Sequence, residues 1–130
     1  MTNQDQTQQL RQAINGFAAA LNDADLTSAQ DFFTEEGKFM PQGFRTLNAQ
    51  ELQLNGNSFL AANTFHIAFN IQDISIENDF ATIIAEAKTN QKNRESAVML
   101  EKTSRDFFVF RKIGDVWKIH RYIFNNVILN

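Results

Sequence analysis

The sequence predicts an α+β fold in which helices from the first part of the chain cover an antiparallel sheet formed by the second. The first observation is a change of period, because apolar residues recur at helical spacing before residue 60 and alternate with a period of two from Thr64 onward. The second is a C-terminal hairpin over residues 105–126, where Gly114 permits a tight reversal between two runs rich in aromatic and β-branched residues. Helices therefore come first, and long strands follow.

The first helix is predicted over residues 3–22, where Gln and Asn occupy the positions between the apolar ones. Its apolar face consists of Leu10, Ile14, Phe17, Ala18 and Leu21. The polar segment 22–25 breaks this helix. A second, short helix then begins at Asp25 or Thr27, either of which can cap it, and ends at Gly37. Its apolar residues are Leu26, Ala29, Phe32 and Phe33.

Residues 38–40 predict a short strand, and a third helix is expected from Asn48 to about Leu60 because Glu51 completes a capping pattern. The long strands are expected over residues 64–77, 80–91, about 97–112 and 116–127. Their short links make consecutive strands antiparallel neighbours. With no internal repeat and no linker, residues 1–130 are expected to form a single domain.

Composition excludes several classes of protein. The chain has no cysteine, which rules out disulfides and thiolate metal sites. Nine of its twelve Lys and Arg residues lie between Lys88 and Arg121, but they alternate with apolar residues along strands, so no nucleic-acid partner is expected. The polar start resembles no secretory signal, and no apolar run reaches the roughly 18 residues of a membrane span. We therefore expect a cytoplasmic protein without a membrane partner.

Both faces of the C-terminal hairpin are apolar. On the first strand, Asp106, Phe108 and Phe110 point one way, whereas Phe107 and Val109 point the other. Strict alternation on the second strand separates Trp117, Ile119 and Ile123 from His120, Tyr122 and Phe124. A sheet of this kind needs cover on each face, so we expect helices on one face and a second copy of the chain, forming a homodimer, on the outer face.

Three segments of the chain resemble the nuclear-transport-factor-2-like superfamily, and its SnoaL-like and ketosteroid-isomerase-like domains in particular. They are the opening at residues 14–26, the Phe-Phe-Thr-Glu-Glu-Gly exit at residues 32–37 and the hairpin at residues 108–119. The resemblance extends over about residues 8–127. It implies a cone-shaped, curved antiparallel sheet wrapped around three N-terminal helices, a cystatin-like roll, with a deep apolar pocket open at one end. Members include isomerases, cyclases, dehydratases, epoxide hydrolases and domains that only bind or scaffold.

The resemblance also implies which positions would carry isomerase chemistry. Ketosteroid isomerases use a tyrosine on the first helix, an aspartate base after the first short strand and a protonated aspartate on a late strand. Those positions hold Phe17, Pro41 or a neighbour of it, and Asp106 in this chain. Two of the three groups are missing, so isomerisation by that mechanism is not expected.

Asp106 is the first candidate for chemistry. It shares a strand face with Phe108 and Phe110, where burial would raise the pKa of the carboxyl and keep it a neutral hydrogen-bond donor. The alternative is that a basic neighbour pairs with Asp106 at a sheet edge. The basic residues within reach are Lys102, Arg105 and Arg121.

His120 and Tyr122 are the other two candidates. They lie two residues apart on a face that the resemblance turns toward the pocket, where they would act as acid or base on a carbonyl or hydroxyl substrate. The alternative is a structural role, with both side chains hydrogen-bonded in the pocket wall. The spacing of His66 and His120 matches no metal motif, so no metal or cofactor is expected.

The resemblance implies a pocket wall formed by Phe17, Phe33, Phe39, Ile67, Phe69, Ile84, Phe108 and Phe124, each of which could equally be core. Which face of the strand at residues 80–91 lines the pocket is left open. Two functions remain. The chain either binds a small hydrophobic molecule, silently or as a cofactor-independent isomerase, cyclase or dehydratase acting on a carbonyl compound, or is a dimeric interaction domain whose pocket is filled. A pocket on the order of several hundred Å³ favours the first.

Overall fold

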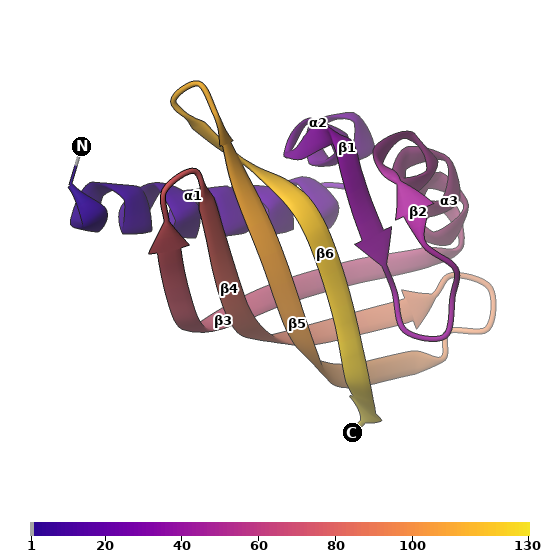
Figure 1. Cartoon of the computed structure of the whole chain (residues 1–130). Coiled ribbons are helices and arrows are strands. Elements are labelled where there is room, and N and C mark those ends of the chain that lie inside the picture. Colours follow the sequence, from indigo (N-terminus) through magenta and orange to yellow (C-terminus); the bar gives the residue numbers. More distant parts are fainter. Residues whose placement is uncertain (1) are drawn as a thin grey trace.

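The computed structural model of the chain describes residues 2–130. Its elements are α1 (Asn3–Asn22), α2 (Leu26–Asp31), β1 (Phe33–Met40), β2 (Leu47–Asn48), α3 (Ala49–Ala62), β3 (Asn63–Glu77), β4 (Phe80–Asn93), β5 (Met99–Ile113) and β6 (Val116–Leu129). The strands form one sheet in the order β2-β1-β6-β5-β4-β3. Figure 1 shows the long strands bending around the helices, with α1 crossing one end of the sheet and α2 and α3 beside β1 and β2. The predicted α+β class and curved sheet are confirmed.

The long elements lie where the sequence predicts them. Helix α1 has the predicted bounds, and Thr2 and Asp5 form its capping box. The four long strands begin and end within two residues of their expected bounds. Two of these strands carry register irregularities, one between Ile71 and Asp73 on β3 and two on β6 where it pairs with β5. Irregularities of this kind bend a strand, which is consistent with the strong curvature in Figure 1.

The predicted second helix is too long. Helix α2 ends at Asp31, and the residues expected to continue it form β1, which pairs with β6 in parallel. The reason is a long-range interaction, because the Ile119 amide donates to the carbonyl of Phe32 at 2.7 Å and brings the chain onto the sheet edge. Gly37 therefore lies within a strand and does not end a helix.

The inner face of the sheet carries the core. Phe108 and Phe110 on β5 are fully buried, as is Ile83 on β4. The sequence leaves open which face of β4 points inward. Burial shows that it is the face with Ala81, Ile83, Ala85 and Ala87. Small alanine side chains on this face leave room for the aromatic residues of the neighbouring elements.

An extra residue on β6 changes which side chains face the core. Val109 pairs with Arg121 and Phe110 pairs with Ile119, so His120 is left over as a β-bulge. Ile119 and Tyr122 are consequently both buried, whereas Ile123 is 37% exposed. Strict alternation would instead place Ile119 and Ile123 on one face and Tyr122 on the other. The prediction that His120 shares a face with Tyr122, and Ile123 with Ile119, is wrong for this reason.

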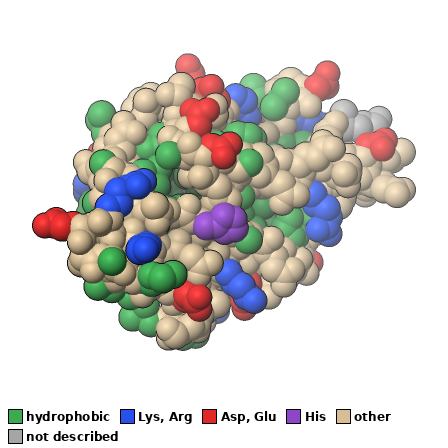
Figure 2. All heavy atoms as spheres, turned by 180° about the vertical axis from the view of Figure 1, so that it is seen from behind, with side chains coloured by type: hydrophobic (Ala, Val, Ile, Leu, Met, Phe, Trp, Pro, Cys, Tyr) green, Lys and Arg blue, Asp and Glu red, His purple; other side chains and the backbone are tan. Residues whose placement is uncertain are grey.

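Charged side chains of both signs are spread over the molecular face in Figure 2, with hydrophobic side chains between them. On this face the Lys and Arg side chains lie at separate points and form no continuous basic surface. None of the helices within residues 2–130 has both the length and the apolar character of a membrane-spanning segment.

We expect Gly37→Ala to destabilise the fold. A Cβ atom at this position would lie 3.0 Å from the Thr34 carbonyl oxygen and 3.1 Å from that of Ile119, and backbone atoms cannot move aside cheaply. The expected loss is roughly 1–3 kcal/mol in the free energy of unfolding, measured by urea denaturation. Glu35→Ala, at an exposed position of the same strand, is the control and should change it by less than about 0.5 kcal/mol. Equal effects of both substitutions would contradict the crowding at Gly37.

Candidate functional site

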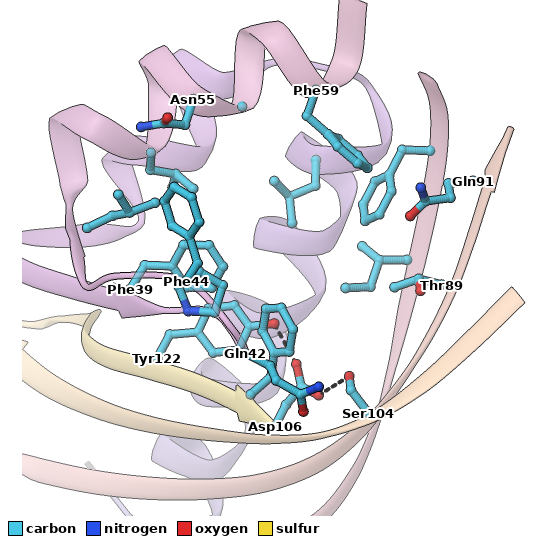
Figure 3. A pocket seen from close by; sticks show the side chains of 18 of the residues that line it. Phe39, Gln42, Phe44, Asn55, Phe59, Thr89, Gln91, Ser104, Asp106 and Tyr122 are labelled. Atoms are coloured by element: carbon cyan, nitrogen blue, oxygen red, sulfur yellow. Dashed lines mark hydrogen bonds between the residues drawn. The ribbon is translucent and has the colours of Figure 1, made fainter. Parts of the chain in front are cut away.

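A cavity of about 560 Å³ lies between the inner face of the sheet, the helices and the loop at residues 41–46 (Figure 3). Its wall is mainly apolar, and the aromatic members are Phe17, Phe39, Phe44, Phe59, Phe65, Tyr122 and Phe124. The polar side chains on the wall are those of Gln42, Asn55, Thr89, Gln91, Lys102, Ser104 and Asp106. Size and composition match those of small-molecule sites, in which a few polar groups orient a largely apolar ligand.

Asp106 and Tyr122 meet at the bottom of this cavity (Figure 3). The Tyr122 hydroxyl donates to Oδ2 of Asp106 at 2.5 Å, and the Ser104 hydroxyl donates to Oδ1 at 2.6 Å. Asp106 is only 1% exposed. The arrangement follows from the pairing of β5 with β6, which places Tyr122 opposite Phe108 and one inward position away from Asp106. The ring of Tyr122 also stacks on Phe108, with 4.2 Å between the ring centroids.

Burial raises the pKa of Asp106 above its ordinary value, although the hydrogen bonds from Ser104 and Tyr122 act in the opposite direction. Burial also raises the pKa of Tyr122 well above the ordinary value of 10.0, and the neighbouring Asp106 adds to this effect. Tyr122 is therefore a phenol at neutral pH. Asp106 is biased toward the neutral carboxyl, which can donate a hydrogen bond.

The alternative in which a basic residue pairs with Asp106 is wrong. Lys102 Nζ donates to Gln91, Arg105 Nε donates to Asn125, and the guanidinium of Arg121 donates to the carbonyl groups of Glu36 and His120. Within residues 2–130 the one ion pair is between Arg45 and Glu51. In the described part of the chain, the carboxyl of Asp106 thus has two hydroxyl partners and no cation.

His120 does not reach the cavity. As the bulge residue it lies on the other side of β6, where Nδ1 is 3.0 Å from the Thr34 hydroxyl oxygen and the ring lies near Phe80. Burial and the positive charges of Arg121 and Arg111 lower the pKa of His120, so the imidazole is neutral at pH 7. His66 is exposed on β3, on the side opposite the buried Ile67. Among the described residues, no three His, Asp or Glu side chains gather as a metal-ligand set.

The residues that were expected to form the pocket wall lie in three different places. Phe17, Phe39, Ile67 and Phe124 line the cavity. Phe33, Phe69 and Phe108 instead belong to the core beside it, where Phe69 and Phe108 pack edge to face. Ile84 was assigned to the wrong face, because it is 37% exposed on the outer side of β4.

Sequence reasoning missed most of the polar side chains on the wall. Ser104 had a readable signal, since it lies two residues before Asp106 and therefore on the same strand face. Gln42, Asn55, Thr89, Gln91 and Lys102 had none, because a polar residue at a strand or helix position usually faces solvent. Of the positions that the resemblance singled out, Phe17, Pro41 and Asp106 all line the cavity, and Tyr122 on β6 lines it as well.

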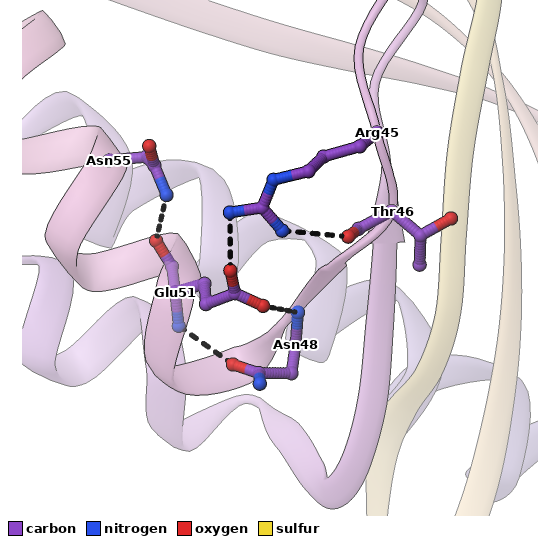
Figure 4. A network of polar contacts seen from close by, with 5 residues as sticks. All are labelled: Arg45, Thr46, Asn48, Glu51 and Asn55. Atoms are coloured by element: carbon purple, nitrogen blue, oxygen red, sulfur yellow. Dashed lines mark hydrogen bonds and ion pairs between the residues drawn. The ribbon is translucent and has the colours of Figure 1, made fainter.

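Polar contacts fasten the loop at the cavity mouth to the start of α3 (Figure 4). Arg45 forms an ion pair with Glu51 at 2.5 Å and donates to the Thr46 carbonyl at 3.2 Å. Glu51 and Asn48 also form the capping box of α3. The hydrogen bond from Arg45 lowers the pKa of Glu51. Because this pair is exposed, it orients the loop more than it stabilises the fold.

The sequence matches no protein-family model and no curated protein. Solved structures do match. A conserved protein from Planctomyces limnophilus superposes with a TM-score of 0.91 at 14% identity, over 98% of this chain and 100% of that one. A nuclear-transport-factor-2-like superfamily protein from Salmonella enterica gives 0.86 at 15% identity, over 95% and 92% of the two chains. A ketosteroid isomerase-like protein from Erwinia carotovora gives 0.80 at 21% identity, over 89% and 92%. The chain therefore has the nuclear-transport-factor-2-like fold.

We expect the pH dependence of stability to report the state of Asp106. Its pKa in the folded protein lies above the ordinary 3.8, so the folded state holds the proton more tightly than the unfolded chain does. Stability relative to Asp106→Asn should therefore be greatest below pH 3.8 and fall as the pH rises through the folded-state pKa. Urea denaturation of both proteins between pH 3 and pH 8 measures the difference. A difference that grows with pH in favour of the wild type would mean that the carboxyl is held as an anion.

Proposed function

We propose that this protein binds a small hydrophobic molecule in the cavity, with a carbonyl or hydroxyl oxygen of that molecule against Asp106. The observation that carries the proposal is an apolar cavity of about 560 Å³ with a buried carboxyl at its bottom that forms no ion pair within residues 2–130. A scaffold filled by its own phenylalanines would leave no space of this size. The volume therefore favours a ligand over the alternative of a purely structural domain.

The contacts around Asp106 support a role as hydrogen-bond donor. Ser104 and Tyr122 hold both carboxyl oxygens in place, so the group is positioned before a ligand arrives. A neutral carboxyl that donates to a ligand oxygen also stabilises negative charge developing there, as an isomerase, cyclase or dehydratase acting on a carbonyl compound requires. The ionisable side chains on the described wall are Lys102, Asp106 and Tyr122, so any proton transfer in such a reaction falls to this set.

We expect a simple ketone to bind less tightly as Asp106 ionises. The probe is 2-nonanone, which carries no charge at any pH, and isothermal titration calorimetry between pH 4 and pH 8 measures its affinity. A neutral Asp106 can donate to the ketone oxygen, whereas the carboxylate can only accept, so the affinity should fall about 3- to 10-fold as the pH rises. Asp106→Asn should remove the pH dependence. An unchanged profile in that variant would exclude Asp106 from ligand recognition.

The same titration needs a control for the cavity itself. Leu60 lines the cavity on α3, and Leu54 on the same helix is 70% exposed and lies outside it. Leu60→Trp should abolish ketone binding by occupying the space, and Leu54→Trp should leave it unchanged. Native mass spectrometry of the purified protein would in addition give the mass of any ligand that it carries. Equal ketone affinity in both tryptophan variants would place binding elsewhere.

We also propose a homodimer through the outer face of the sheet. Ile84, Phe107 and Ile123 are aligned across β4, β5 and β6, and each is 37–38% exposed. An apolar row across the middle of a sheet is typical of a surface that a partner covers. This interface would leave the cavity, on the opposite face, free for the ligand.

Phe107→Glu should convert the dimer into a monomer, because it introduces an unpaired charge at the centre of the interface. Sedimentation velocity at about 100 µM protein measures the state. The control is Leu54→Glu, which introduces the same charge at a 70% exposed position on α3, away from the outer face of the sheet, and should leave the dimer intact. A monomeric wild-type protein at this concentration would exclude the proposed interface.

A further inference from the structure

Lys102 is a cation on the cavity wall that has no acidic partner among residues 2–130. Its ammonium donates to Oε1 of Gln91 at 3.3 Å, and the single ion pair of the described chain lies elsewhere, between Arg45 and Glu51. The side chain is half-buried beside a largely apolar space. A charge removed from water in this way is costly unless an opposite charge reaches it. The position of Lys102 therefore suits an anion that enters with the ligand.

Two further polar side chains lie on the neighbouring strand beside Lys102. Thr89 lies directly opposite Lys102 in the β4–β5 pairing, and Gln91 follows two residues later on the same inward face. Figure 3 shows the side chains of Thr89 and Gln91 on the cavity wall. Because Oε1 of Gln91 accepts from Lys102, the amide NH₂ of Gln91 is left to donate to a ligand. Ammonium, amide and hydroxyl together form a donor set that an oxyanion can satisfy.

This donor set lies some distance from Asp106. Lys102, Ser104 and Asp106 follow one another at every second position of β5, so their side chains share the inward face. Four residues of strand separate the Cα atoms of Lys102 and Asp106 by about 13 Å. A ligand that reaches both therefore carries its two polar groups at opposite ends of an apolar body.

The number of basic side chains on the cavity wall limits the charge of an anion that can bind there. Lys102 is the one basic side chain on the described wall, and a half-buried dianion would leave a negative charge without a partner. We propose that the ligand is an organic monocarboxylate, whose carboxylate binds Lys102, Gln91 and Thr89 while its apolar part fills the cavity. The inference rests on the proposed function, since it names the class of molecule that the same cavity takes.

A matched pair of probes tests the proposal. Octanoate and 1-octanol have the same apolar chain and differ in charge at pH 7.5. We expect isothermal titration calorimetry to show octanoate binding roughly 10-fold or more tightly than 1-octanol to the wild-type protein. Lys102→Met should abolish this preference by weakening octanoate roughly 10-fold more than 1-octanol, and Lys102→Arg should retain it. Lys88→Met, on the outer face of β4, is the control and should bind both probes as the wild type does. Lys102→Gln replaces the methionine variant if that variant does not fold.

The outcomes distinguish a failure of the carboxylate proposal from a failure of the proposed cavity function. If both probes bind equally to the wild type, or Lys102→Met weakens both to the same extent, the carboxylate proposal is overturned and the proposed cavity function stands. If neither probe binds and 2-nonanone does not bind either, the proposed function fails and the carboxylate proposal fails with it. A charge preference that disappears only in the neutral Lys102 variants supports the proposal.

Discussion

The extra residue at His120 determines which side chains β6 presents to the interior. Before the bulge, Trp117 and Ile119 face the core, and after it Tyr122 and Phe124 do. Without the bulge, continued alternation would turn Tyr122 outward and bring Arg121 and Ile123 inward. Asp106 would then lose its phenol partner, and a guanidinium would have to be buried among phenylalanines. One unpaired residue therefore maintains both the aromatic core and the polar pair at the bottom of the cavity.

Tyr122 connects these two parts of the interior. Its ring stacks on Phe108 at 4.2 Å and on Phe39 at 5.0 Å and meets the edge of Phe17 at 5.9 Å between centroids, while its hydroxyl reaches Asp106. The ring contributes to packing and the hydroxyl satisfies a buried carboxyl, which is the usual advantage of tyrosine in an apolar site. Since aromatic packing holds the ring on several sides, the hydroxyl is fixed in position. The carboxyl of Asp106 is in turn held by hydroxyl groups, and because no cation within residues 2–130 pairs with it, burial raises its pKa.

How much of the fold and of the site could be predicted from the sequence depended on how far apart in the chain the interacting residues lie. Helix α1 and the four long strands were predicted within two residues because each carries many repeats of its own period. The stretch from Phe33 to Gly37 was assigned to a helix, because its short local pattern fits either structure and its strand form depends on β6, more than 80 residues later. Ile84 was placed on the wrong face because both faces of its strand contain apolar residues. The bulge at His120 leaves no mark in an alternating pattern, so the fold was more predictable than the site.

The curvature of the sheet explains why this interior contains both a filled core and an open cavity. Near the β5–β6 turn, α1 packs against a wall of fully buried side chains that includes Phe110 and Ile119. Toward the other ends of these strands the sheet continues to bend, and α3 covers it at a distance that its few buried residues, Ala49 and Leu52, do not close. The strand face changes character along the same line, from Phe110 and Phe108 to Asp106, Ser104 and Lys102. The polar residues thus begin where the packing ends, and this coincidence is the physical reason to regard the cavity as a binding site and not as a packing defect.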